Sequence, residues 1–205
     1  MQPVGSIFIA SKIKSKRAGD PEVRALLRQY LHAIHKHTDT VVLEELGLCQ
    51  GDVRVDVASV NREFSGFEIK SPSDTLARFP KQRRIYSRVV DRAWLVAPIK
   101  TLEKAQTPQW WGQIAVFDSD DKLALRVIRP SALNPSVDAL SIAKLLWHDE
   151  AIAALKRAGH ARGVMSKSRK FAWDRIVEMM PLEDLRATLR AALKNRPSRI
   201  AQLAR

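Results

Sequence analysis

Residues 53–71 read VRVDVASVNREFSGFEIKS, and this stretch decides the fold. Its residues alternate in the manner of two β-strands, one from Val53 to Val60 and one from Phe64 to Ser71. The three residues between them suit the loop of a tight hairpin. The sequence therefore predicts an antiparallel pair of strands here.

The loop length sets the register of this hairpin, with Arg62 at its centre. Asp56 then lies opposite Glu68 and Arg54 lies opposite Lys70, all on one face. On the other face we expect the core residues Val53, Val55, Val57, Phe67 and Ile69.

Two opposed carboxylates are the unusual feature of this hairpin. Asp56 and Glu68 would lie roughly 5 Å apart at Cβ and repel each other. A divalent cation such as Mg²⁺ or Mn²⁺, which prefers oxygen ligands, would turn that repulsion into coordination. The alternative is a solvated polar face on which Arg54 and Lys70 neutralise the two acids.

The next segment predicts a strand–helix–strand crossover. Pro80 suits the first turn of a helix that runs to about Val90. Gln82 and Tyr86 stand four residues apart on one face of that helix. Residues 93–97 are a short apolar run, which is typical of a buried parallel strand.

Asp56, Glu68-x-Lys70 and Gln82-xxx-Tyr86, in this order, resemble the PD-(D/E)xK nuclease superfamily, and the last pair resembles its RecB-like members. Val55 stands where the superfamily's nominal proline would be. The chain from about residue 20 to residue 195 is also similar to an uncharacterised bacterial family with the locus-tag name sce-seven-seven-two-six. The stretches that carry this likeness are residues 44–48, 54–58, 66–71, 74–76 and Trp147-His148-Asp149-Glu150.

The resemblance implies an α/β fold with a restriction-endonuclease-like mixed sheet flanked by helices. It also implies a Mg²⁺- or Mn²⁺-dependent nuclease that hydrolyses DNA in repair, defence or mobile-element processing. The implied metal ligands are Glu45, Asp56, Glu68 and the carbonyl of Ile69, and the implied catalytic residues are Asp56, Glu68, Lys70, Gln82 and Tyr86. The alternative is a nucleic-acid-binding subunit with a nuclease-like fold, inactive or dependent on a partner.

Two helices are expected before the hairpin. Asp20 would cap the first, with Pro21 at its first position. The second would run from about Thr38 to Leu46 and end at Gly47. It would carry the acid that completes the site, for which Glu45 is favoured and Glu44 is the alternative, although both also suit a surface position.

The net charge of +13 and the pI of about 10.3 favour a polyanionic partner, nucleic acid first. Lys and Arg are in excess after Ala151, and the sequence holds no base-reading motif, so we expect contacts through phosphates. The expected contacts are Arg162, Lys167, Arg169 and Lys170, or, beside the site, Arg78, Lys81, Arg83 and Arg84.

The second half of the chain predicts one more hairpin and then helices. Residues 110–117 and 123–128 read as strands, and Trp110-Trp111 suit packing better than base stacking. Beyond Pro130 we expect helices, the first over residues 137–157. We therefore divide the chain into a nuclease-like core, 1–130, and a basic helical extension, 131–205.

The remaining sequence features concern the cellular compartment and the membrane. A single cysteine, Cys49, excludes an internal disulfide and suits a reducing cytoplasm. No apolar run is long enough for a transmembrane helix, and the N-terminus lacks the pattern of a signal peptide. We expect a cytoplasmic protein without membrane contact, with a protein partner or a homodimer left open. His32, His35 and His37 suit surface positions better than a zinc site.

Overall fold

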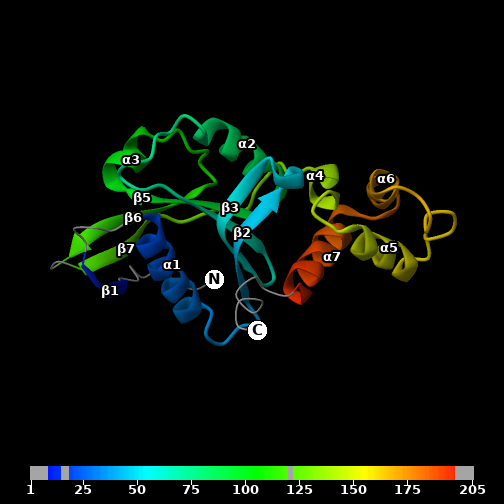
Figure 1. The fold of residues 1–205 in the computed structure, drawn as a ribbon, viewed down its shortest axis with the longest axis horizontal. Helices are drawn as coiled ribbons and strands as arrows, with labels where there is room; N and C mark the ends of the chain where they lie inside the picture. The colour runs from blue at the N-terminus through cyan, green and yellow to red at the C-terminus, as the bar shows by residue number, and fades with distance from the viewer. Residues whose placement is uncertain (1–8, 15–18, 120–121, 197–205) are drawn as a thin grey trace.

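The computed structural model describes residues 9–14, 19–119 and 122–196. Within these residues, seven strands form one sheet in the order β1-β7-β6-β5-β4-β3-β2 (Figure 1). The β4–β5 and β5–β6 pairs are parallel and the other pairs are antiparallel. The expected α/β fold with a mixed, mostly antiparallel sheet is confirmed. The strands are β1 (Ile9–Lys14), β2 (Val41–Leu48), β3 (Val53–Val60), β4 (Phe64–Ile69), β5 (Arg92–Pro98), β6 (Gly112–Ser119) and β7 (Lys122–Arg129).

Helices cover both faces of the sheet. On one face α1 (Asp20–Ile34) packs with Val57, Phe67 and Ile69 in a hydrophobic group that we call the α1 cluster. On the other face α2 (Phe79–Val89) belongs to a larger group, the α2 cluster. The last four helices gather beside β2 and β3 (Figure 1). The remaining helices are α3 (Ile99–Lys104), α4 (Ala139–Ala143), α5 (His148–Arg157), α6 (Arg169–Met179) and α7 (Leu182–Asn195).

The predicted hairpin is present, and its register is confirmed where the strands pair. Val60 pairs with Phe64, Ala58 with Gly66, and Val57 with Phe67. Regular pairing ends at the Val57–Phe67 pair, directly next to Asp56 and Glu68. The strands therefore separate at the point where the two acids lie, which leaves room for their side chains.

The expected division into one core face and one polar face is wrong. Val53 and Val55 belong to the α2 cluster, whereas Val57 belongs to the α1 cluster. The inward-facing side chains of β3 therefore change from one face of the sheet to the other between Val55 and Val57. The residue of β2 beside this point is Glu45, and its φ of 53° lies in the left-handed region. Because helices cover both faces, Asp56, Glu68 and Lys70 lie in a partly buried site, whereas Arg54 stays exposed.

The prediction of a second helix before the hairpin is also wrong. Residues 41–48 form β2, which pairs antiparallel with β3 along its length. The β-branched residues Val41 and Val42 suit a strand, and β3 supplies hydrogen-bond partners on one side of it. Glu44 and Glu45 therefore come from a strand.

Smaller differences concern the helix ends. The N-cap of α1 is Gly19, whose N–H donates to the Glu22 carboxylate at 2.8 Å, so Asp20 lies inside the first turn. The crossover helix α2 and strand β5 form as predicted. We expected a single helix over residues 137–157, but two helices, α4 and α5, form there, because the backbone is extended at Trp147. Strand β1 was not anticipated.

The C-terminal helices share a core with the sheet, as expected of an extension. Ile142, Leu155, Trp173 and Leu193 belong to the α2 cluster with sheet residues such as Leu95. Where the domain boundary falls stays a prediction. Trp111 is fully buried and its ring packs on Tyr86 at 5.5 Å, as expected for packing. Among the described residues, every helix is too short or too polar to span a bilayer.

Candidate active site

The candidate site is an open pocket of about 540 Å³ where β3 and β4 separate. Asp56 enters it from β3, and Glu68 and Lys70 enter from the end of β4. Gln82 reaches it from α2, as the sequence predicts. The structure therefore brings together in one place the acids, the lysine and the glutamine that the motif singles out.

Glu68 is the buried centre of this site, with 1 % of its surface exposed. Its Oε1 accepts hydrogen bonds of 2.5 Å from Lys70 Nζ and from Gln82 Nε2. Its Oε2 accepts one of 2.9 Å from the Tyr86 hydroxyl, which lies fully buried. Burial raises the pKa of Glu68 and the positive charge of Lys70 opposes that rise. Lys70 also donates to Gln82 Oε1 at 3.1 Å, so these four side chains form one connected unit.

Asp56 lies beside this unit. Its Oδ2 accepts a hydrogen bond of 2.7 Å from the Ile69 N–H, at the point where pairing of β3 with β4 ends. Burial, and to a smaller extent the negative charge of Glu68, raise the pKa of Asp56 to about 7. The site thus holds two carboxylates whose joint ionisation is costly, which is the electrostatic condition that a bound cation relieves.

Arg24 of α1 is the residue that sequence reasoning missed. It donates to Glu45 Oε1 at 2.6 Å, to the Asp56 carbonyl at 3.0 Å and to Asp20 Oδ2 at 2.8 Å. Its guanidinium also lies 3.5 Å from Asp56 Oδ1. A helix position four residues after an acid is the signal that predicts the pair with Asp20. The contacts with β2 and β3 depend on tertiary packing.

Of the two candidate acids, Glu44 and Glu45, only Glu45 lies at the pocket. Glu45 lines the pocket and pairs with Arg24 and Arg54. Glu44 pairs with Arg28, at 3.1 Å, outside this pocket. Asp20 also lines the pocket, although the sequence suggests only a helix cap for it.

The donor set of the pocket suits a hard divalent cation in its chemistry. Asp56 and Glu68 offer carboxylate oxygens, and Ile69 lies beside them. Within the described residues, no three His, Cys, Asp or Glu side chains come together as a ready metal cluster. Arg24 pairs with Glu45, and hydrogen bonds already occupy both oxygens of Glu68.

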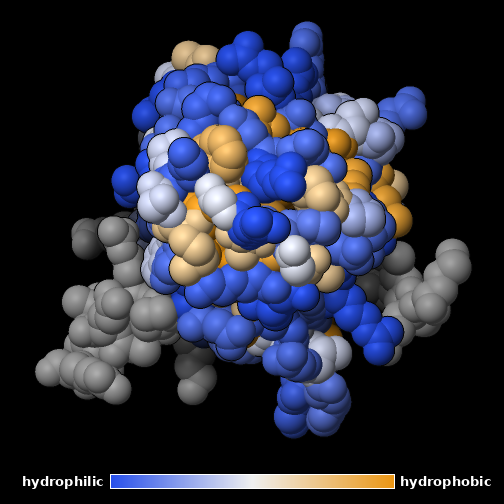
Figure 2. Space-filling view, turned by 90° about the vertical axis from the view of Figure 1, so that its right-hand side faces the viewer, coloured by the Kyte–Doolittle hydropathy of each residue, from blue (hydrophilic) through white to orange (hydrophobic). Residues whose placement is uncertain are grey.

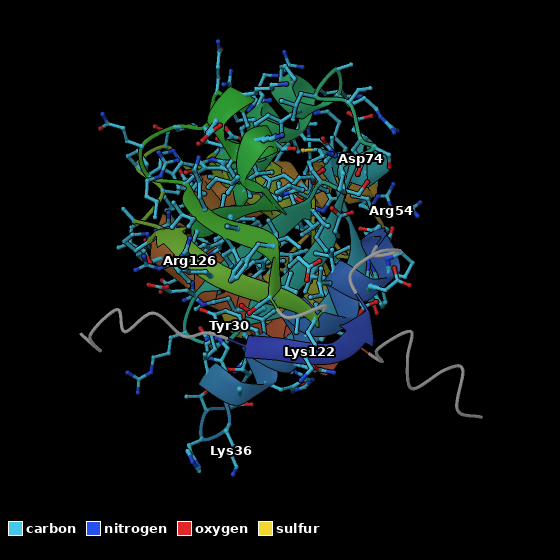
Figure 3. The ribbon with its side chains drawn as sticks, turned by 90° about the vertical axis from the view of Figure 1, so that its left-hand side faces the viewer. Tyr30, Lys36, Arg54, Asp74, Lys122 and Arg126 are labelled. Atoms are coloured by element: carbon cyan, nitrogen blue, oxygen red, sulfur yellow. The ribbon has the colours of Figure 1, made fainter. Side chains whose placement is uncertain are left out.

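Of the expected nucleic-acid contacts, Arg78 and Lys81 line the pocket together with Arg54. Arg54 and Asp74, which also lines it, lie on the same side of the molecule in Figure 3. Arg83 is turned toward the carbonyl of Gln106, and Arg84 is exposed on α2. The other expected group, Arg162, Lys167, Arg169 and Lys170, lies at the start of α6 and in the loop before it.

The fold and the pocket define an α/β protein with a buried acid–lysine unit. The chain belongs to the bacteriophage P4 protein cII family, whose model matches residues 14–203. Among solved structures, the chain is similar to the SPO1766 protein of unknown function from Silicibacter pomeroyi. The identity is 21 %, over 66 % of this chain and 89 % of that chain, with a TM-score of 0.39. A comparison with curated proteins gave no match.

Proposed function

We propose that this protein is a metal-dependent nuclease of the PD-(D/E)xK type that hydrolyses phosphodiester bonds in DNA. The observation that carries the proposal is the buried unit in which Lys70, Gln82 and Tyr86 all donate to Glu68, beside Asp56. A stable core gains little from burying an acid next to another acid. Such an arrangement is instead typical of sites with perturbed titration and catalytic work.

Asp56 and Glu68, with the carbonyl of Ile69, are the residues that would hold Mg²⁺ or Mn²⁺. The raised pKa of Asp56 supports this assignment because it records two carboxylates close together and away from water. A divalent cation bound there would neutralise charge on the phosphate and polarise the attacking water. Glu45 joins the ligands directly or through water only if its ion pair with Arg24 opens.

The remaining members of the unit position one another. Lys70 places a positive charge in the wall of the pocket, where it orients the attacking water and offsets charge that develops on the phosphate. Gln82 bonds both Lys70 and Glu68, and Tyr86 fixes the second oxygen of Glu68. Loss of either helix residue therefore misplaces the acid and the lysine together.

The charge around the pocket supports a nucleic-acid substrate. Arg54, Arg78 and Lys81 are exposed at its margin, and the chain carries a net charge of +13. Phosphates of a strand that crosses the pocket would meet these residues, with no base reader needed. The family name places one member in a bacteriophage, which fits the processing of mobile-element DNA.

The test is cleavage of plasmid and linear DNA with Mg²⁺ or Mn²⁺ by the wild type, Asp56→Ala and Lys70→Ala. We expect cleavage by the wild type and its loss in both variants, with thermal unfolding to show that each is folded. Asp149→Ala, which removes an exposed acid of α5, is the control and should cleave as the wild type does. Equal cleavage by all four proteins would indicate a contaminant and reject the proposal.

A second candidate is a nucleic-acid-binding subunit that lacks activity or gains it from a partner. The observation in its favour is Arg24, which already neutralises Asp56 and Glu45 from within the chain. Titration calorimetry with Mn²⁺ separates the two. The nuclease predicts binding that Asp56→Ala abolishes. The subunit predicts no such binding, together with DNA binding that weakens steeply as salt rises.

A further inference from the structure

A second groove, of about 450 Å³, lies between β2 and the C-terminal helices. We call it the β2 groove. Glu45 and Gly51 line both this groove and the candidate active site, so the two hollows are neighbours that share this part of their walls. On its far side the groove is lined by Lys144, Trp147, Arg169 and Arg196. A chain-like ligand that leaves the active site across Glu45 therefore enters the β2 groove.

The charges of the groove are unequal. Its acids are already neutralised, Glu44 by Arg28 and Glu45 by Arg24 and Arg54. Lys144 and Arg169 also line the groove, and within the described residues neither forms a salt bridge. After internal pairing the groove therefore keeps an excess of positive charge, which favours an anionic ligand.

Trp147 supplies a stacking surface at the groove. Half of its surface is exposed, and the Arg196 guanidinium lies over its ring at 4.4 Å. Glu150 anchors the Arg196 side of this pair, because it accepts hydrogen bonds from Arg196 at 2.5 Å and from the backbone N–H of Trp147 at 2.7 Å. The exposed part of this ring suits stacking with a nucleobase. The face that carries these helices is largely hydrophilic, with hydrophobic residues among the polar ones (Figure 2).

We propose that the β2 groove binds a single strand of DNA that continues from the candidate active site. Lys144 and Arg169 contact its phosphates, and an unpaired base stacks on Trp147 beside Arg196. The occupant is a single strand because a paired base in a duplex does not present its face to an aromatic side chain. The inference rests on the proposed function for the identity of the ligand as DNA. It also gives a role to the Trp147–Glu150 stretch.

The test is equilibrium binding of a fluorescent oligothymidylate in the presence of EDTA, so that no cleavage is needed. Trp147→Ala should weaken binding by about tenfold, the loss of one base–aromatic stack. Trp147→Phe keeps an aromatic face and should retain most of the affinity. Lys144→Gln and Arg169→Gln should each make the negative slope of log affinity against log salt shallower by about 0.7.

Matched controls are Phe171→Ala, an exposed aromatic residue of α6, and Lys122→Gln, an exposed cation of β7 that Figure 3 shows on the side away from the C-terminal helices. Both should bind as the wild type does. Unchanged affinity in Trp147→Ala and an unchanged salt slope in the two glutamine variants would overturn the inference. So would a duplex that binds as tightly as the single strand and responds equally to Trp147→Ala.

This experiment also separates the inference from the proposed function. Binding that depends on Trp147, together with no cleavage in Mn²⁺, rejects the nuclease and keeps the groove. Cleavage that depends on Asp56, together with binding indifferent to Trp147, Lys144 and Arg169, rejects the groove and keeps the nuclease.

Discussion

The Tyr86 hydroxyl donates a hydrogen bond of 2.9 Å to Oε2 of Glu68, and both side chains are buried. The other oxygen of Glu68 accepts hydrogen bonds of 2.5 Å from Lys70 and Gln82. A buried carboxylate is tolerated only when it is paired and hydrogen-bonded. The three donors therefore stabilise the fold as well as arrange the site, and this dual role can be measured.

Tyr86→Phe should lower the free energy of unfolding by about 1–3 kcal/mol, because it leaves one oxygen of a buried carboxylate without its donor. Urea denaturation measures the change. Tyr30→Phe is the control, since Tyr30 is buried in the α1 cluster and its hydroxyl has no hydrogen-bond partner among the described residues. Equal losses in both variants would mean that the bond to Glu68 contributes nothing.

Lys70→Met should destabilise the protein at neutral pH by about 3–5 kcal/mol, the usual result of removing one partner of a buried ion pair. Adding Glu68→Gln to this variant should restore part of the loss, because the amide carries no charge that needs a partner. A double-mutant cycle from urea denaturation gives the coupling. Strictly additive effects would show that the two side chains do not interact.

In EDTA, stability should fall as pH rises from about 4 to about 7 because of Asp56. Its pKa is raised from 3.8 to about 7 in the folded protein. Between these values the folded state binds more protons than the unfolded state, so raising the pH favours unfolding. The contribution is at most about 4 kcal/mol. Asp56→Asn should remove this part of the pH profile, whereas Asp149→Asn should keep it. An unchanged profile in Asp56→Asn would contradict the assignment.

Arg24→Gln should lower stability without metal by about 1.5–3 kcal/mol, because it removes charged hydrogen bonds to Asp20 and Glu45. Mn²⁺ should then raise the thermal midpoint more than it does in the wild type, because Glu45 and Asp56 are free to bind it. Arg28→Gln, which breaks the ion pair with Glu44, should leave the Mn²⁺ response unchanged. A response that is equal in all three proteins would exclude competition between Arg24 and the metal.

The sequence predicted most of the hairpin and crossover because both are local. A three-residue loop fixes which residues pair, and side chains that alternate or recur at four positions fix which face they share. Spacing indicates that Gln82 and Tyr86 share one face of α2, and packing of that helix on the sheet brings both to Glu68. The chemistry that we assign to them stays a prediction.

The errors came from segments whose structure depends on strand pairing or on an unusual backbone angle, which the residue pattern does not show. Residues 41–48 have a pattern that fits either a short helix or a strand, and pairing with β3 decides for the strand. The slip of alternation at Glu45 follows from a backbone conformation that glutamate rarely adopts, which no local pattern reveals.

The sequence by itself thus determined the register of the hairpin and the order of the motif along the chain, since both follow from short-range geometry. Only the tertiary structure decided that Arg24 of α1 meets Glu45 of β2 and Asp56 of β3. It also decided that Trp147 and Arg196 lie across β2 from the candidate site. These contacts join residues far apart in the chain, and packing of the helices on the sheet is what brings them together.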